Sequence, residues 1–147
     1  MSYQIEVKAV PAQTIAVIRR QVRQAELSKV VPDGCGQVWK FLTTHGIRGG
    51  RHVALYWDGA INLEVGAEVD APVTGDGNVS SSATPAGVVA TTVHIGPYQL
   101  LHQAHEAIRK WRDANGRNFA GPSWEVYGHW TDDPSQLRTD VFYLLAD

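Results

Sequence analysis

The second half of the chain repeats the order of structural signals found in the first half. Three pairs of segments carry the match: 38–46 with 108–116, 52–57 with 123–128, and 61–65 with 137–141. In each half a segment with apolar residues at helical spacing ends at a glycine, and two strand-like segments follow. With the strand before the helix, each half forms a strand–helix–strand–strand module. A module this small buries too little apolar surface to be stable alone. We therefore expect two modules to join their sheets and place both helices on one side.

This repeat predicts an α+β fold of duplicated β-α-β-β modules in one antiparallel sheet, with two helices on one face. At 147 residues the chain suits a single domain, 1–147. We place the first repeat at about 3–69 and the second at about 88–147. Residues 70–87 are rich in Pro, Gly, Ser, Thr and Asp, so we interpret them as the linker.

Periodicity and turn residues predict the individual elements. The expected strands cover residues 3–10, 14–22, 52–57, 61–69, 88–95, 123–130 and 137–145, and the expected helices cover 35–45 and 98–114. We expect a turn at Val31-Pro32-Asp33-Gly34 before the first helix and a hairpin at Asp58-Gly59. Gly46 and Gly116 are natural stops for the two helices.

Charge and cysteine content exclude several classes of protein. A net charge of −2 argues against a broad nucleic-acid-binding surface. The single cysteine, Cys35, excludes an intrachain disulfide and a cysteine-based zinc cluster. Its place near a predicted helix start could lower the pKa of its thiol. The N-terminus does not resemble a signal peptide, and no apolar run reaches the roughly 20 residues of a membrane helix. We predict a cytoplasmic protein.

The strand at 123–130 carries the main functional candidate, Glu125. Alternation puts Glu125 and Tyr127 on one face of this strand and Trp124 on the other. In the repeat, Tyr56 is the counterpart of Tyr127, and Ala54 stands where the second half has Glu125. We expect a cleft where the halves meet, at the pseudo-twofold axis, and clefts of this kind often bind ligands. It would be roomy, aromatic and singly negative; alternatively, Glu125 lies on a solvated face.

Further aromatic residues complete the predicted ligand-binding set. Trp57 ends its strand and could form a rim, and Trp124 is the neighbour of Glu125. Tyr98 follows Gly-Pro at a helix start, where a packing or capping role is an equally good interpretation. Phe142 lies on the last strand, and its face is not fixed by the sequence. For Tyr56 and Tyr127, a role in lining the cleft with aromatic rings is a better interpretation than a role as proton donors.

An ordered set of short segments resembles the GyrI-like family. In the second half these are 94–98 (His-Ile-Gly-Pro-Tyr), 124–127 (Trp-Glu-Val-Tyr) and 137–141 (Leu-Arg-Thr-Asp-Val), with weaker agreement at 55–58 and 64–69. That family, within the SOUL-like superfamily, includes the effector-binding domains of AraC-type and MerR-type multidrug regulators. The match covers nearly the whole chain, and it is the order of the segments that makes it specific.

The resemblance implies a pocket for aromatic, often cationic, small molecules, with the acid at the position of Glu125 meeting the ligand's positive charge. The leading hypothesis is therefore a stand-alone small-molecule-binding protein of the multidrug-recognition type, related to transcription regulators. Some relatives hydrolyse strained cyclopropane rings, which leaves enzymatic activity open, with Glu125 and Tyr127 as catalytic residues. Other relatives inhibit DNA gyrase, a protein-partner role that the mild charge of this chain does not support.

We expect no cofactor and no metal site. His102 and His105 lie three residues apart on one predicted helix, but no third ligand is evident. The chain leaves no room for a helix-turn-helix domain beside the predicted fold, so we expect no direct binding to nucleic acid. Since it has no long apolar run, we also expect no membrane partner.

Overall fold

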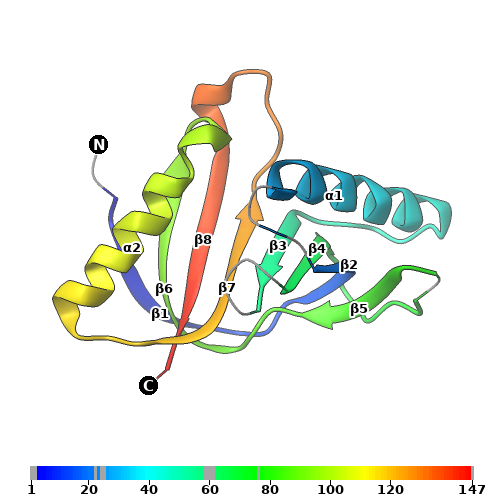
Figure 1. Ribbon diagram of the computed structural model, residues 1–147. Helices are drawn as coiled ribbons and strands as arrows, with labels where there is room; N and C mark the ends of the chain where they lie inside the picture. Colours follow the sequence, from blue (N-terminus) through cyan, green and yellow to red (C-terminus); the bar gives the residue numbers. More distant parts are fainter. Residues whose placement is uncertain (1–2, 22, 24–25, 58–61, 76, 147) are drawn as a thin grey trace.

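A single curved antiparallel sheet runs through the protein, as the computed structural model shows (Figure 1). The structure describes residues 3–21, 23, 26–57, 62–75 and 77–146, so the predicted hairpin at Asp58-Gly59 lies outside the described residues. The eight strands are β1 (Glu6–Val10), β2 (Thr14–Gln21), β3 (His52–Tyr56), β4 (Asn62–Glu68), β5 (Val79–Ala83), β6 (Gly87–Ile95), β7 (Phe119–Tyr127) and β8 (Arg138–Leu145). The helices are α1 (Leu27–Thr44) and α2 (His102–Asn115), with short 3-10 turns at Tyr98–Leu100 and Pro134–Gln136.

The strand order is symmetric about the centre of the sheet. It runs β1-β6-β8-β7-β3-β4-β2-β5, so β3 and β7 meet in the middle as the counterparts predicted by the repeat. Ala54 of β3 pairs directly with Glu125 of β7. The predicted α+β class with one antiparallel sheet is confirmed.

Residues 70–87 differ from the expected linker because they contain strand β5. β5 pairs with β2, and β1, the first strand of the chain, pairs with β6. Each half therefore opens with a strand that is hydrogen-bonded to the other half. Polar composition hid β5: its serines are partly exposed at the sheet edge, and Ser82 Oγ donates to Glu64 at 2.6 Å. Main-chain pairing along an edge strand does not require an apolar side-chain pattern.

Helix α1 begins eight residues earlier than predicted, and the turn expected at 31–34 is wrong. Leu27, Val30 and Val31 pack against the sheet around Cys35, which extends the helix through Pro32. Gly34 allows this close contact, since a Cβ there would lie 3.1 Å from the Val65 side chain. Tertiary packing thus outweighs the local turn signal.

The ends of the second half also shift. Helix α2 stops at Asn115, and Gly116 takes the left-handed conformation (φ 62°) that the sequence predicted for a helix stop. β7 covers Phe119–Tyr127 rather than 123–130, so His129 and Trp130 follow the strand in a loop. In the described part of the chain, neither helix is both long and apolar enough to cross a membrane.

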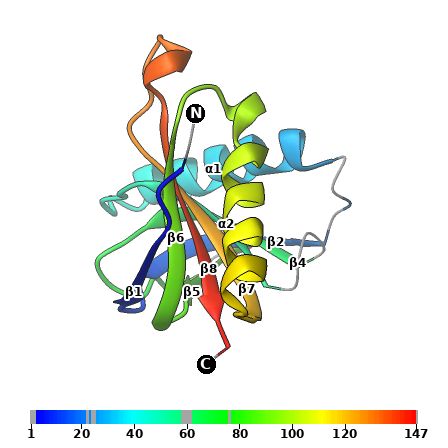
Figure 2. The ribbon, with the colours of Figure 1, turned by 90° about the vertical axis from the view of Figure 1, so that its left-hand side faces the viewer.

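Both helices pack on the same face of the sheet. α1 covers a core that includes Ala16, Ile18 and Ala67, and α2 covers a core that includes Val141 and Tyr143. Figure 2 shows α2 lying along β6 and β8. The opposite face has its own apolar core, made by Ile15, Val17, Val53, Leu55, Val89, Trp124 and Val126. The prediction that both helices cover one face is confirmed. The side chains of β3 and β7 that point to this face therefore lie between α1 and α2.

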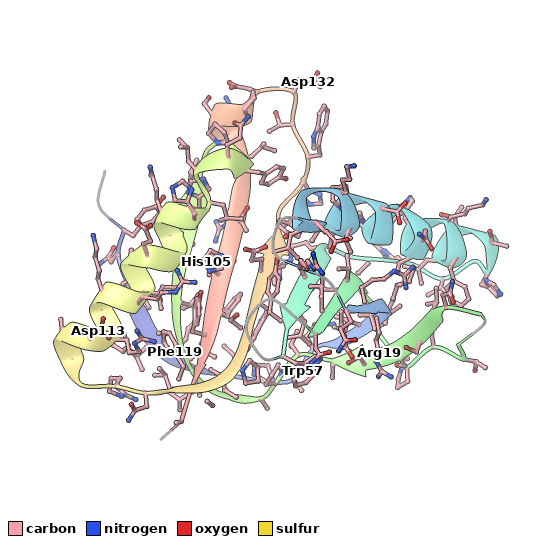
Figure 3. All side chains as sticks on the ribbon, viewed as in Figure 1. Arg19, Trp57, His105, Asp113, Phe119 and Asp132 are labelled. Carbon is pink, nitrogen blue, oxygen red and sulfur yellow. The ribbon has the colours of Figure 1, made fainter. Side chains whose placement is uncertain are left out.

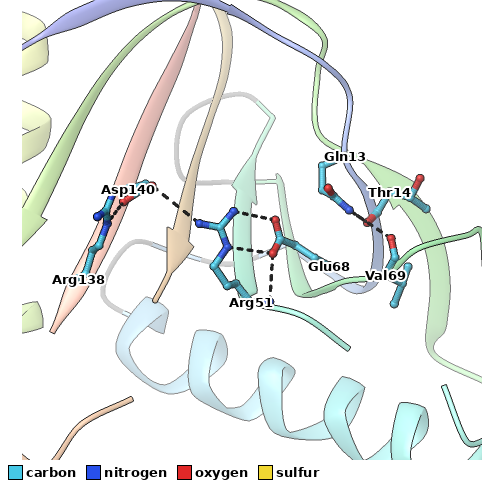
Figure 4. A network of polar contacts seen from close by, with 7 residues as sticks. All are labelled: Gln13, Thr14, Arg51, Glu68, Val69, Arg138 and Asp140. Carbon is cyan, nitrogen blue, oxygen red and sulfur yellow. Dashed lines mark hydrogen bonds and ion pairs between the residues drawn. The ribbon is translucent and has the colours of Figure 1, made fainter. Parts of the chain in front are cut away.

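A polar network connects the halves near the start of β3 (Figure 4). Arg51 forms an ion pair with Glu68 at 3.0 Å and reaches Asp140 at 3.9 Å, and Asp140 also accepts from Arg138 at 2.9 Å. The hydrogen bond from Arg51 to Glu68 raises the pKa of Arg51. Exposed pairs of this kind contribute little individually, on the order of 0–1 kcal/mol. The network therefore links the two halves but adds little stability.

Candidate functional site

Glu125 is a buried carboxylate, with 6% of its surface exposed, on the helix-covered face of β7. Its Oε1 accepts hydrogen bonds from the hydroxyls of Tyr127, at 2.5 Å, and Tyr56, at 3.4 Å. Its Oε2 lies 2.6 Å from Nε2 of His105, which projects from α2. The carboxylate is thus surrounded by neutral hydroxyl groups on one oxygen and an imidazole on the other.

The tyrosines beside Glu125 are held in their protonated form. Burial raises the pKa of Tyr56, and the negative charge of Glu125 raises it further. The same two causes, in the same order, raise the pKa of Tyr127 well above its ordinary value. Both hydroxyls therefore act as hydrogen-bond donors to the carboxylate at neutral pH.

A second row of polar groups continues from His105 toward the C-terminal strand. Nδ1 of His105 lies 2.6 Å from the hydroxyl of Tyr143, and Nη2 of Arg109 donates to the same hydroxyl at 3.3 Å. The rings of His105 and Tyr143 meet edge to face, with centroids 5.6 Å apart. Figure 3 shows His105 on α2, facing β8. We name the set formed by Tyr56, His105, Arg109, Glu125, Tyr127 and Tyr143 the Glu125 cluster.

The duplicated sheet explains why the cluster lies at the centre of the molecule. β3 and β7 are paired along the pseudo-twofold axis, so Tyr56 and Glu125 come from different halves of the chain. Ala54, fully buried beside Glu125, leaves the first half without an acid at the equivalent position. Thr139, the register partner of Tyr127, is also buried, and its hydroxyl has no hydrogen-bond partner within the described residues.

Tyr98 is the predicted residue that adjoins the cluster from the surface. It is 44% exposed, in the 3-10 turn before α2, and its ring meets that of Tyr127 edge to face with centroids 5.9 Å apart. Tyr98 and Tyr127 thus form an aromatic path from solvent toward Glu125. The structure brings together Ala54, Tyr56, Tyr98, Glu125 and Tyr127 of the predicted set.

The remaining three predicted residues lie elsewhere. Trp124 points to the opposite face of the sheet, where its ring stacks on Phe142 with centroids 5.3 Å apart. Trp57 follows β3, and Figure 3 shows it near Arg19 and away from His105. There it borders a shallow cleft of about 380 Å³. The cleft is lined by Arg19, Arg20, Gln21, Trp57, Asn62, Leu63 and Glu64, so Trp57 is the predicted site residue that it contains.

Sequence reasoning missed the part of the cluster contributed by α2 and β8. The sequence marks His105 and His102 only as a possible pair of metal ligands without a third, and in the structure the two side chains have different partners. His102 is exposed and lies against the carbonyl of Gln99, whereas His105 faces Glu125. The useful signal was its position on the apolar stripe of the helix, next to Ala104 and one turn before Ile108. The described residues contain no group of three or more side chains suited to hold a metal ion.

The thiol of Cys35 does not have the environment that the sequence suggested. Because α1 begins at Leu27, Cys35 lies in the middle of the helix and is buried against the sheet. Burial raises the pKa of the thiol to about 12 instead of lowering it. Cys35 is therefore a packing residue beside the cluster and not an activated nucleophile.

The side chains of the cluster suit two kinds of small-molecule site, one that binds a cation and one that activates water. A buried carboxylate next to exposed and half-buried rings can attract a cation and stack on its aromatic groups. A carboxylate that is hydrogen-bonded to an imidazole can also act as a general base and take a proton from water. Both options depend on the same side chain, Glu125.

Comparison with known proteins gives one family match and several similar structures. The model of the GyrI-like small molecule binding domain matches residues 3–145. The C-terminal domain of EcmrR superposes with a TM-score of 0.83 at 22% sequence identity, covering 100% of this chain and 99% of that domain. No curated protein matches the chain significantly.

Two more distant structures share the fold. SAV2435, solved bound to tetraphenylphosphonium, has a TM-score of 0.66 at 15% identity, covering 99% of this chain and 94% of that one. A protein described as a hydrolase from Listeria innocua has a TM-score of 0.61 at 10% identity, covering 99% and 93%. At these identities the likeness shows the fold alone.

Proposed function

The chain belongs to the GyrI-like family of small-molecule-binding domains, and from this premise we propose that it binds aromatic cations at the Glu125 cluster. The family resemblance read from the sequence is confirmed by the match over residues 3–145. The proposed ligand class and the residues that contact it are our own inference. If it binds the ligand without catalysing a reaction, it would act as a sensor or a sequestering module.

We base this proposal on one observation: Glu125 is buried, and within the described residues it pairs with no arginine or lysine. Its hydrogen-bond partners among the described residues are two phenols and an imidazole. Glu64, the other buried glutamate, is instead paired with Arg19 at 2.8 Å. Because an uncompensated buried charge costs several kcal/mol, a carboxylate held in this way gains when a ligand supplies the positive charge.

The aromatic side chains around Glu125 suit the rest of such a ligand. Tyr98 is exposed, and Tyr56 and Tyr127 are half-buried, so ring surface leads from solvent to the carboxylate. Ring faces attract cations by about 0.5–2 kcal/mol each, depending on solvent exposure. The side chains of Glu125 and its partners are packed in contact, so we expect binding to move at least one of them aside.

Titration with tetraphenylphosphonium, the cation bound to SAV2435, tests the proposal. Isothermal titration calorimetry would compare the wild type with Glu125→Gln and with Glu64→Gln as the matched control. Both substitutions remove one buried carboxylate, but Glu64 lies on the opposite face of the sheet. We expect Glu125→Gln to weaken binding by about tenfold or more, since the charge attraction is lost, and Glu64→Gln to bind as the wild type does.

Two results would contradict the proposal. One is unchanged affinity in Glu125→Gln; the other is absence of detectable binding to the wild type at millimolar tetraphenylphosphonium. Circular dichroism spectra and unfolding midpoints of both variants would show that any loss of binding is not a loss of folding.

A second function, hydrolysis of electrophilic natural products, is favoured by the contact between Glu125 and His105. A carboxylate 2.6 Å from an imidazole can activate a water molecule, and Tyr56 or Tyr127 can donate to the departing oxygen. Incubation with a cyclopropane-bearing alkylating compound, followed by mass spectrometry of the products, separates the two functions. A hydrolase would add water to the compound and lose this activity in Glu125→Gln, whereas a binding protein would leave the compound intact.

A further inference from the structure

His105 lies directly beside the carboxylate of Glu125. Its Nε2 atom lies 2.6 Å from Oε2, while the hydroxyls of Tyr56 and Tyr127 are both directed at Oε1. The side chains of His105 and Glu125 are 14% and 8% exposed, so the contact is largely shielded from solvent. The imidazole is therefore the group with the closest approach to the second oxygen of the carboxylate among the described residues.

The hydrogen bonds around His105 fit two protonation forms of its ring. Arg109 can only donate to the hydroxyl of Tyr143, and that hydroxyl can either donate to Nδ1 of His105 or accept from it. When the hydroxyl donates to Nδ1, Nε2 carries the hydrogen and donates to Glu125. In that form the imidazole is neutral and does not offset a negative charge on Glu125.

Adding one proton to His105 changes the charge of the pair without moving an atom far. The protonated ring donates from both nitrogens, and the hydroxyl of Tyr143 turns to accept from Nδ1. The pair of His105 and Glu125 is then neutral in total. Imidazole is the side chain whose charge ordinarily changes between pH 5 and 8.

The other ionisable groups that face this pair stay in one form across that pH range. Burial raises the pKa of the tyrosines and of the thiol, so they remain protonated, and the arginines remain charged. These groups are Tyr56 from β3, Tyr127 from β7, Tyr143 from β8, Cys35 from α1, Tyr98 from the turn before α2, and Arg109 and Arg112 from α2.

We propose that His105 is a specificity-determining residue of the Glu125 site, acting as an internal counter-ion that competes with a cationic ligand. This inference rests on the proposed function. With His105 neutral, the site presents one uncompensated negative charge and selects cations. With His105 protonated, the positive charge is already in place and the preference for cations is lost.

Linkage makes the competition reciprocal. A proton on His105 weakens binding of the cation, and a bound cation weakens binding of the proton by the same factor. Affinity for a permanent cation therefore falls with decreasing pH, with a limiting slope of about tenfold per pH unit, as expected for one proton in competition with one ligand.

The test is tetraphenylphosphonium affinity from pH 5 to pH 8 in four proteins: wild type, His105→Gln, His102→Gln and Glu125→Gln. Glutamine keeps a hydrogen-bond donor near Glu125 but carries no charge. We expect the wild type and His102→Gln to lose about tenfold in affinity or more between pH 8 and pH 5. We expect His105→Gln to lose less than about threefold over the same range.

The outcomes separate this inference from the proposed function. If Glu125→Gln binds as tightly as the wild type at pH 8, the proposed function itself fails. If Glu125→Gln loses binding but His105→Gln keeps the pH dependence of the wild type, only the role of His105 is overturned.

A measurement on the wild-type fold supplies a second readout. Nuclear magnetic resonance titration of the histidine ring protons, with His105 assigned by its absence in His105→Gln, follows the imidazole directly. Saturating tetraphenylphosphonium should move the His105 titration to lower pH and leave that of His102 in place. Glu125→Gln should have the same effect on His105 without any ligand, and an unmoved titration in both experiments would overturn the inference.

Discussion

Ala54 and Glu125 are direct register partners on β3 and β7, so the central seam of the sheet sets a methyl group beside a carboxylate. The duplicated halves offer two equivalent positions here, and an acid stands at one of them. Both side chains are buried under the two helices. Because Ala54 is fully buried, a larger side chain at this position would press on the acid.

Ala54→Leu should force a larger side chain against Glu125. We expect it to lower the free energy of unfolding by about 1–3 kcal/mol through overpacking and to weaken binding of tetraphenylphosphonium. Ala67→Leu is the matched control, because Ala67 is equally buried on the same face but lies under α1. Urea unfolding and calorimetric titration of both variants check this. Equal binding by the two leucine variants would show that the ligand does not lie near Ala54.

Tyr127→Phe should remove the shortest hydrogen bond to Glu125. A buried bond to a charged acceptor contributes about 1.5–3 kcal/mol, so urea unfolding should show a loss of stability in this range. Tyr98→Phe is the control, since Tyr98 is 44% exposed and meets Tyr127 through its ring. We expect a change within about 0.5 kcal/mol for the control. A similarly small change in Tyr127→Phe would refute a structural role for its hydrogen bond.

Stability should fall at alkaline pH because of the buried tyrosines. The pKa values of Tyr56, Tyr127 and Tyr143 are all raised, with burial as the largest cause. In the unfolded chain tyrosine ionises near pH 10, so above about pH 10 the unfolded state releases protons that the folded state retains. The stabilisation is complete below that pH and decreases above it, by up to about 1.4 kcal/mol per pH unit for each tyrosine.

Urea unfolding at pH 8, 10 and 11 measures this dependence, with Tyr56→Phe as the comparison. The variant should start from a lower stability and lose less between pH 10 and pH 11. Parallel pH profiles for the two proteins would show that Tyr56 ionises as easily in the folded state as in the unfolded one.

Cys35 should react slowly with thiol reagents in the native protein. Its thiol is buried and its pKa is raised to about 12, so the thiolate is scarce at pH 8. We expect alkylation by iodoacetamide at pH 8 to follow the unfolding transition in urea, as detected by intact mass. Fast alkylation without urea would contradict the buried position in α1.

The sequence predicted the parts of the fold that depend on local pattern. Alternating residues identified β3 and β7, and Gly116 marked the end of α2. It did not predict β5, because an edge strand of Ser80, Ser81 and Ser82 is held by main-chain bonds and has no apolar signal. The start of α1 was missed for a different reason: apolar contacts with the sheet stabilise the turn of helix around Pro32.

The candidate site was predicted as far as strand pairing could place it. Alternation put Glu125 and Tyr127 on one face, and the repeat put Ala54 and Tyr56 next to them. The contribution of His105 depends on the packing of α2 over β6 and β8, which a single sequence does not specify. Trp124 is sequence neighbour to Glu125 but faces the other core, as the alternation itself requires.

The pairing of β1 with β6 and of β5 with β2 has a consequence for how such a protein can exist at all. The first strand of each half pairs with the other half, so a half-length polypeptide could complete this sheet only by exchanging strands with a second molecule. Carrying both halves in one chain turns a concentration-dependent encounter into an internal step. One chain can also hold alanine at one of two equivalent positions and glutamate at the other, which a symmetric homodimer cannot do.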